Sequence, residues 1–126
     1  MFSLFKDRRE QLELMAGFKE AAALSSWTLI NLIEQNESFF SDRRDEFDLA
    51  KNALDRGMKF SENGNHRVAY MHFMSYIDRT IEKNIDIVLA HQKLVDSINR
   101  IRNLQRGTLI PLWEKHQHKL VRVKNT

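Results

Sequence analysis

Between residues 66 and 105 the sequence contains neither glycine nor proline, and this stretch limits the possible folds more than any other feature. Its apolar residues recur at intervals of three, four or seven positions, which places them on one face of an α-helix; they are Ala69, Phe73, Ile77, Ile81, Val88, Val95, Ile98 and Ile101. One unbroken helix of this length would extend about 60 Å, which is long for a small domain. The sequence leaves open whether the helix is continuous or breaks near residues 83–86.

The rest of the chain also favours helices. The 126 residues include four glycines and one proline, too few for the tight turns of an all-β fold. We expect helices at residues 3–38, 42–62 and 112–123, a turn at Asn63-Gly64-Asn65, a helix end at Gly107 and a linker at residues 108–111. The predicted fold is all-α: an elongated four-helix bundle or antiparallel helical hairpin with one long helix. Residues 1–107 form the bundle, and residues 108–126 form a linker and a short basic C-terminal helix.

The turn at Asn63 predicts that the helices on either side of it form a tight hairpin. Folding them back around this turn places Gly57 opposite Ala69, Ala53 opposite Phe73, Ala50 opposite Tyr76, and Phe60 opposite His66, so that at least one member of most pairs is small. Two helix axes approach closely when small and large side chains alternate across the contact. We expect the closest approach at Gly57, which explains a glycine inside a helix.

A small–large spacing extends across this hairpin, as Gly57-x2-Phe60-x3-Gly64-x4-Ala69-x3-Phe73. In this respect residues 50–81 resemble a single tetratricopeptide unit, and residues 50–105 resemble a MIT-type three-helix domain. The sequence departs from the tetratricopeptide pattern at Arg56, Tyr76 and Ile81, where that family favours Leu, Ala and Pro.

Both families mainly bind peptides or helices, so the resemblance implies a surface for a protein partner on the hairpin. The residues expected there are Phe60, His66, Tyr70, Phe73 and Tyr76. The alternative is that the spacing reflects hairpin packing alone, because any tight helical hairpin selects the same residue types.

The charge of the chain is uneven. Residues 1–99 carry 13 Lys and Arg against 16 Asp and Glu, whereas residues 100–126 have a net charge of +6. The basic residues of this tail are Arg100, Arg102, Arg106, Lys115, Lys119, Arg122 and Lys124. A basic amphipathic helix binds nucleic acid, anionic lipid or an acidic partner. The alternative is a solvated helix whose apolar side packs on the bundle through Trp113.

The sequence predicts no catalytic residue, metal or cofactor. Arg67-x4-His72 resembles the motif of HEPN-type ribonucleases, small helical bundles in which such an Arg and His serve RNA cleavage, but about one match is expected by chance in this composition. The absence of cysteine excludes thiolate metal sites. We interpret His116 and His118 as solvated, because they point apart on a helix and no third ligand follows at a suitable spacing.

No apolar run approaches the roughly 20 residues that span a bilayer, and the N-terminus lacks the apolar core of a signal peptide. We therefore expect a cytoplasmic protein. The leading prediction for its function is a non-enzymatic adaptor or regulatory protein, homodimeric because its long helix leaves apolar surface uncovered. The alternatives are an accessory nucleic-acid-binding protein that uses the basic tail and a HEPN-like ribonuclease.

Overall fold

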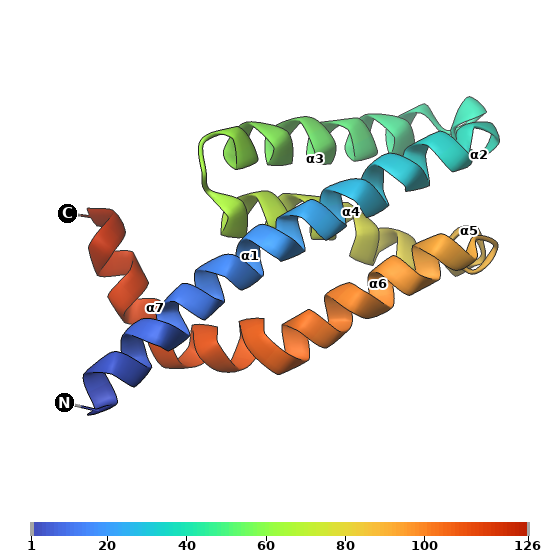
Figure 1. Ribbon diagram of the computed structural model, residues 1–126. Coiled ribbons are helices and arrows are strands. Elements are labelled where there is room, and N and C mark those ends of the chain that lie inside the picture. The colour runs from blue at the N-terminus through green and yellow to red at the C-terminus, as the bar shows by residue number, and fades with distance from the viewer. Residues whose placement is uncertain (1, 126) are drawn as a thin grey trace.

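The computed structural model describes the backbone of residues 2–125 and the side chains of residues 4–118, and it consists of packed helices (Figure 1). The helices are α1 (Phe2–Gln35), α2 (Glu37–Ser41), α3 (Arg44–Glu62), α4 (His66–Lys83), α5 (Ile85–Leu89), α6 (Gln92–Leu104), the π-helical turn η1 (Gln105–Leu109) and α7 (Ile110–Asn125). Residues 2–125 contain no β-strand. The all-α prediction is confirmed.

Helix α1 is the long helix of the fold and the element that the others surround. Its 34 residues extend about 51 Å. Figure 1 shows the α3–α4 hairpin beside its C-terminal half, α6 running along it, and α7 beside its N-terminal half. The main core lies among α1, α3, α4 and α6, and a second cluster lies among α1, η1 and α7.

Residues 66–105 do not form one continuous helix, which confirms one of the two alternatives that the sequence left open. Helix α4 ends at Lys83, and α5 is a single short helix before α6 begins at Gln92. The break lets α6 return along α1, where Leu94, Ile98 and Ile101 are buried. A buried hydroxyl pair, with Thr28 Oγ1 and Ser97 Oγ 2.9 Å apart, joins α1 to α6. An unbroken helix would leave these apolar residues without a partner in the chain.

The hairpin between α3 and α4 is confirmed, with Gly64 at its turn in the left-handed region (φ 78°). Its side-chain pairs differ from the prediction: a Cβ on Gly57 would lie 2.7 Å from Cζ of Phe73, and the ring of Phe60 stacks on His72 instead of His66. Helical side chains lean toward the N-terminus of their own helix. Contacts across an antiparallel hairpin are therefore displaced from the Cα pairing that the sequence suggests.

The predicted helix end at Gly107 is wrong, and residues 108–111 do not form a linker. The backbone stays helical from Gln92 through η1 into α7. Proline inside an α-helix lacks a donor and its ring clashes with the carbonyl four residues earlier. The wider π turn just before Pro111 relieves this clash, so the chain continues without a stop. The proposed division into domains at residue 107 stays a prediction.

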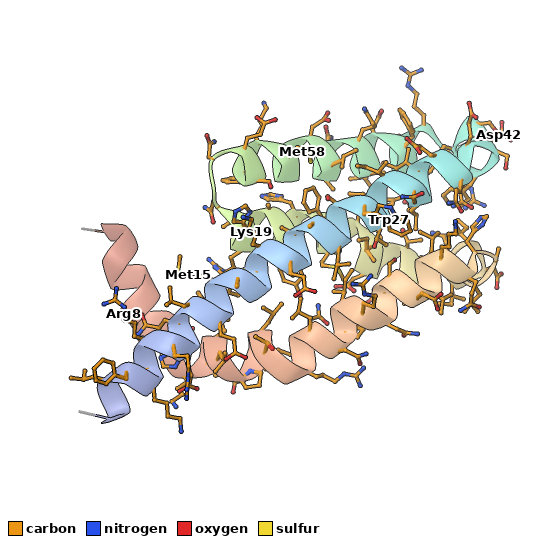
Figure 2. All side chains as sticks on the ribbon, viewed as in Figure 1. Arg8, Met15, Lys19, Trp27, Asp42 and Met58 are labelled. Carbon is orange, nitrogen blue, oxygen red and sulfur yellow. The ribbon has the colours of Figure 1, made fainter. Side chains whose placement is uncertain are left out.

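Not all large apolar residues of α1 are buried. Leu14 is fully buried, whereas Met15 and Trp27, both labelled in Figure 2, are 56% and 41% exposed. Phe39 and Phe40 belong to the short helix α2, and Phe40 is buried. Helices α4 and α6 both pack against α1, whose buried face also includes Phe18, Ala22, Ser25, Leu29 and Leu32.

A polar network joins α3 to α4 at the edge of the core. Arg79 Nη2 donates a 2.9 Å hydrogen bond to Oε1 of Glu46, and the Tyr76 hydroxyl donates a 3.2 Å hydrogen bond to Oε2. The Arg79 hydrogen bond lowers the pKa of the Glu46 carboxyl. Burial, with the adjacent Glu46 charge, raises the pKa of Tyr76 to about 12.

We expect the protein to lose about 2–3 kcal/mol of stability between pH 10 and pH 12 through Tyr76. Folding favours the neutral phenol, so its contribution is complete below the unfolded pKa of 10.0 and is lost as the pH rises through the folded value. Urea unfolding across this window measures the loss. Tyr76→Phe removes the titrating group, so its stability should fall less steeply; an equal fall in both proteins would contradict the assignment.

Candidate functional site

A pocket of about 470 Å³ opens where α4, η1 and α7 meet the side of α1. Its lining side chains come from four elements: Phe18 of α1, Arg67, Tyr70 and Met71 of α4, Gln105 and Leu109 of η1, and Ile110, Trp113 and Glu114 of α7. A volume of this size is typical of ligand-binding pockets. The pocket is therefore the candidate functional site.

Three aromatic rings form the inner wall of the pocket. The centroid of Phe18 lies 5.8 Å from that of Trp113 in an edge-to-face arrangement, and 6.2 Å from that of Tyr70. The attraction between such rings adds to the free energy gained by burying their apolar area. Phe18 also belongs to the buried cluster with Leu14, so the wall is anchored in the core.

The polar groups of the pocket are mostly bonded to one another. The Arg67 guanidinium lies 4.4 Å from the centroid of the Trp113 ring, a cation–π contact. Gln105 Nε2 donates a hydrogen bond to the hydroxyl of Tyr70. Burial raises the pKa of the Tyr70 phenol, which stays neutral at physiological pH. The pocket thus offers mainly apolar area, with one positive and one negative side chain, Arg67 and Glu114, in its lining.

The π turn η1 shapes this site. It carries Gln105 and Leu109 into the pocket and turns the chain so that Trp113 of α7 faces Phe18. Gly17 permits the contact, because a Cβ there would lie 3.0 Å from Cδ2 of Leu109. Single π turns inside helices occur frequently at functional sites. Pro111 is the one local signal for this turn, because a wider turn relieves the clash of the proline ring with the preceding helical backbone.

The structure separates the five residues expected to bind a partner. Tyr70 lines the pocket. Phe73 and Tyr76 are 0% and 3% exposed and belong to the core, so they offer no surface in this fold. Phe60 is 36% exposed and His66 is half-buried, both outside the pocket lining. Sequence reasoning missed Phe18, Met71 and Ile110 as site residues, because helices distant in the chain bring them together.

Arg67 and His72, which carry the resemblance to HEPN-type ribonucleases, have different neighbours. Arg67 lies over Trp113, and His72 stacks on Phe60 with ring centroids 5.2 Å apart. Five residues of helix rotate the two side chains about 140° apart around the axis. Their contacts therefore lie on two different surfaces of α4.

The described part of the basic tail is partly neutralised. Arg102 donates a 2.6 Å hydrogen bond to Asp78, and Lys115 donates a 2.8 Å hydrogen bond to Glu10. Arg106 bonds to the carbonyl of Arg102, and Arg100 is exposed. The side chains of Lys119, Arg122 and Lys124 lie outside the described residues. The expected packing of the last helix through Trp113 is confirmed, since Trp113 packs against the cluster around Phe18.

The interpretation of His116 as a solvated tail residue is wrong. Its side chain is 0% exposed, held between α7 and the N-terminal half of α1, and near Glu10. His118, two residues further on, is exposed as expected. Within the described residues, no helix combines the length and the hydrophobicity that crossing a lipid bilayer requires.

Comparison with known proteins finds no family model, no curated protein and no solved structure that matches this chain. The resemblance of the hairpin to a tetratricopeptide unit or a MIT-type domain therefore stays a prediction.

Proposed function

We propose that this chain is a non-enzymatic, cytoplasmic interaction module, an adaptor or regulatory protein that receives apolar side chains of a partner protein in the pocket beside Trp113. The observation that carries the proposal is an aromatic-walled pocket with an exposed apolar rim. Met71 and Ile110 at this rim are each 52% exposed. Trp, Tyr and Arg are the residues that most often dominate the binding energy of interfaces.

The chemistry of the lining supports docking over catalysis. None of the nine lining residues is Cys, Ser, Thr, His or Lys, so the pocket lacks the side chains that most often act as nucleophile or general base. Arg67, Tyr70 and Gln105 already have contacts within the protein. What the pocket gains from an occupant is burial of apolar area, which is worth about 25 cal/mol per Å².

The occupant that fits best is an amphipathic helix with one or two large apolar side chains on one face. The walls are themselves helices, and a helix laid across them presents residues at i, i+3 and i+4. Met71 at the rim adapts its shape to such side chains. An acidic residue beside them would meet the charge of Arg67.

Selection from a displayed peptide library tests the proposal. The full chain serves as bait, and Ile110→Glu, which puts a charge on the rim without changing a buried residue, serves as the counter-selection bait. We expect enriched peptides with apolar residues at helical spacing that bind the wild type and not Ile110→Glu. The control Leu89→Glu changes a residue that is 62% exposed on α5 and should bind normally. Peptides that bind all three proteins equally would show that the pocket is not the binding site.

The homodimer is a second proposal, supported by an exposed stripe on α1. Phe5, Leu12 and Met15 are 71%, 59% and 56% exposed, and their spacing places them on one face of the helix. Apolar stripes of this kind commonly pair between copies of a chain.

We expect the wild type to sediment as a dimer and Leu12→Glu as a monomer, because the charge would be buried in the contact. Leu49→Glu, on α3 and 44% exposed, should leave the dimer intact. A monomeric wild type, or a dimer that survives Leu12→Glu, would exclude pairing through this stripe.

The nucleic-acid-binding and ribonuclease alternatives stay predictions. Salt-dependent binding of RNA or DNA is the measurement for the first, since phosphate contacts weaken steeply with salt. RNA cleavage that is lost in a folded His72→Ala variant is the measurement for the second.

A further inference from the structure

His116 is a fully buried imidazole whose two nitrogens have no hydrogen-bond partner. The side chain is 0% exposed, and both Nδ1 and Nε2 lack a partner among the described residues. A buried polar group without a partner keeps the full cost of its lost hydration, so native proteins nearly always satisfy such groups. An imidazole in this position therefore calls for a ligand that the chain itself does not supply.

Two carboxylates of α1 lie next to this imidazole. Asp7 and Glu10 are one helical turn apart, and one oxygen of each lies with a His116 nitrogen inside a group whose atoms are all within 4.8 Å of one another. Nε2 of His116 is 3.8 Å from Oε1 of Glu10. This distance is too long for a hydrogen bond. It is close to the spacing of about 3.4 Å between two ligands of one tetrahedral zinc ion, whose bonds are about 2.0–2.2 Å.

We propose that Asp7, Glu10 and His116 bind a divalent transition-metal ion, best matched by Zn²⁺, which links α7 to the N-terminal half of α1. One imidazole and two carboxylates form a mixed nitrogen and oxygen set, whereas Mg²⁺ and Ca²⁺ prefer oxygen alone. Three protein ligands leave a fourth position for water. Asp7 and Glu10 are only partly buried, which gives the ion a path from solvent. The site does not depend on the pocket or its occupant.

Lys115 competes with the ion for the carboxylate of Glu10. Its Nζ donates a 2.8 Å hydrogen bond to Oε1 of Glu10, and this bond lowers the pKa of the Glu10 carboxyl. A cation bound by this oxygen would take the place of the lysine ammonium. The Lys115 side chain is 47% exposed, so it is able to turn into solvent when a cation takes its place. Removing the lysine should strengthen binding.

Titration of the chelator-treated full chain with Zn²⁺, by calorimetry and by thermal unfolding, tests the proposal. We expect one ion per chain and a higher melting temperature with zinc. Asp7→Asn and His116→Gln should each lower the affinity at least about tenfold, and Lys115→Gln should raise it. Replacing Zn²⁺ with Co²⁺ should give the visible absorption of a tetrahedral site, lost in Asp7→Asn.

His118→Ala is the matched control, because His118 is an exposed histidine of the same helix. It should leave the zinc affinity unchanged. Asp7→Asn alters a partly exposed residue, so it keeps the test decisive if His116→Gln fails to fold. The proposal is overturned if zinc does not bind, if Asp7→Asn binds as tightly as the wild type, or if His118→Ala removes binding.

Discussion

Phe73→Ala is expected to lower the free energy of unfolding by about 3–5 kcal/mol. The Phe73 ring is 0% exposed and packs directly against Gly57 of α3, where it leaves no room for a Cβ. Removing it opens a cavity between α3 and α4 that helices held by other contacts close only partly. Small proteins have about 5–15 kcal/mol of total stability, so the loss is a large fraction. Urea unfolding followed by far-ultraviolet circular dichroism measures it.

Phe60→Ala is the matched control for this prediction. Phe60 lies on the same hairpin but is 36% exposed, and its ring stacks on His72. Its removal should cost about 1 kcal/mol, since truncating a partly exposed side chain leaves no enclosed cavity. Equal losses for the two phenylalanines would contradict the assignment of Phe73 to the core and of Phe60 to the surface.

Trp113→Ala is expected to weaken binding of a selected peptide about thirtyfold or more, the effect of losing an interface residue worth at least about 2 kcal/mol. The Trp113 ring forms one wall of the pocket and is fixed from two sides, by Phe18 at 5.8 Å and by the Arg67 guanidinium at 4.4 Å. A rigid aromatic wall binds without a large ordering cost, so its loss removes both area and preorganisation. Fluorescence anisotropy of a labelled peptide measures the affinity.

Trp27→Ala is the control for this variant, because the chain has two tryptophans and Trp27 is absent from the pocket. It removes an equally large ring from a site that is 41% exposed and should leave peptide affinity unchanged. Unfolding curves of both variants show whether each is folded at the assay temperature. Equal loss of binding in the two variants would indicate a general effect on the fold.

Local signals explain which parts of the fold were predictable from sequence. The helical spacing of apolar residues and the turn at Asn63-Gly64-Asn65 act within a few residues, so the all-α class and the α3–α4 hairpin follow from them. The small positions Ala53 and Gly57 also marked the buried face of α3, since both are buried. Each of these features depends on neighbours close in the chain.

Features that depend on distant segments were missed. By local rules, Gly107 and Pro111 predict the end of a helix. The helical backbone continues through both residues, where η1 packs against α1. His116 looked solvated because its neighbours in space, such as Glu10, come from the other end of the chain. The pocket has the same origin, since Phe18 and Trp113 meet only after α7 docks on α1. A single sequence carries no periodic signal for contacts of this kind.

The most direct test of the proposed docking site is a map of peptide-induced chemical-shift changes in the isotope-labelled full chain. We expect the largest changes at the Trp113 indole and at Phe18, Tyr70 and Leu109, with little change on α3. Changes concentrated on the hairpin around Phe60, or on the exposed Arg100 of the basic tail, with none at the Trp113 indole, would contradict the account.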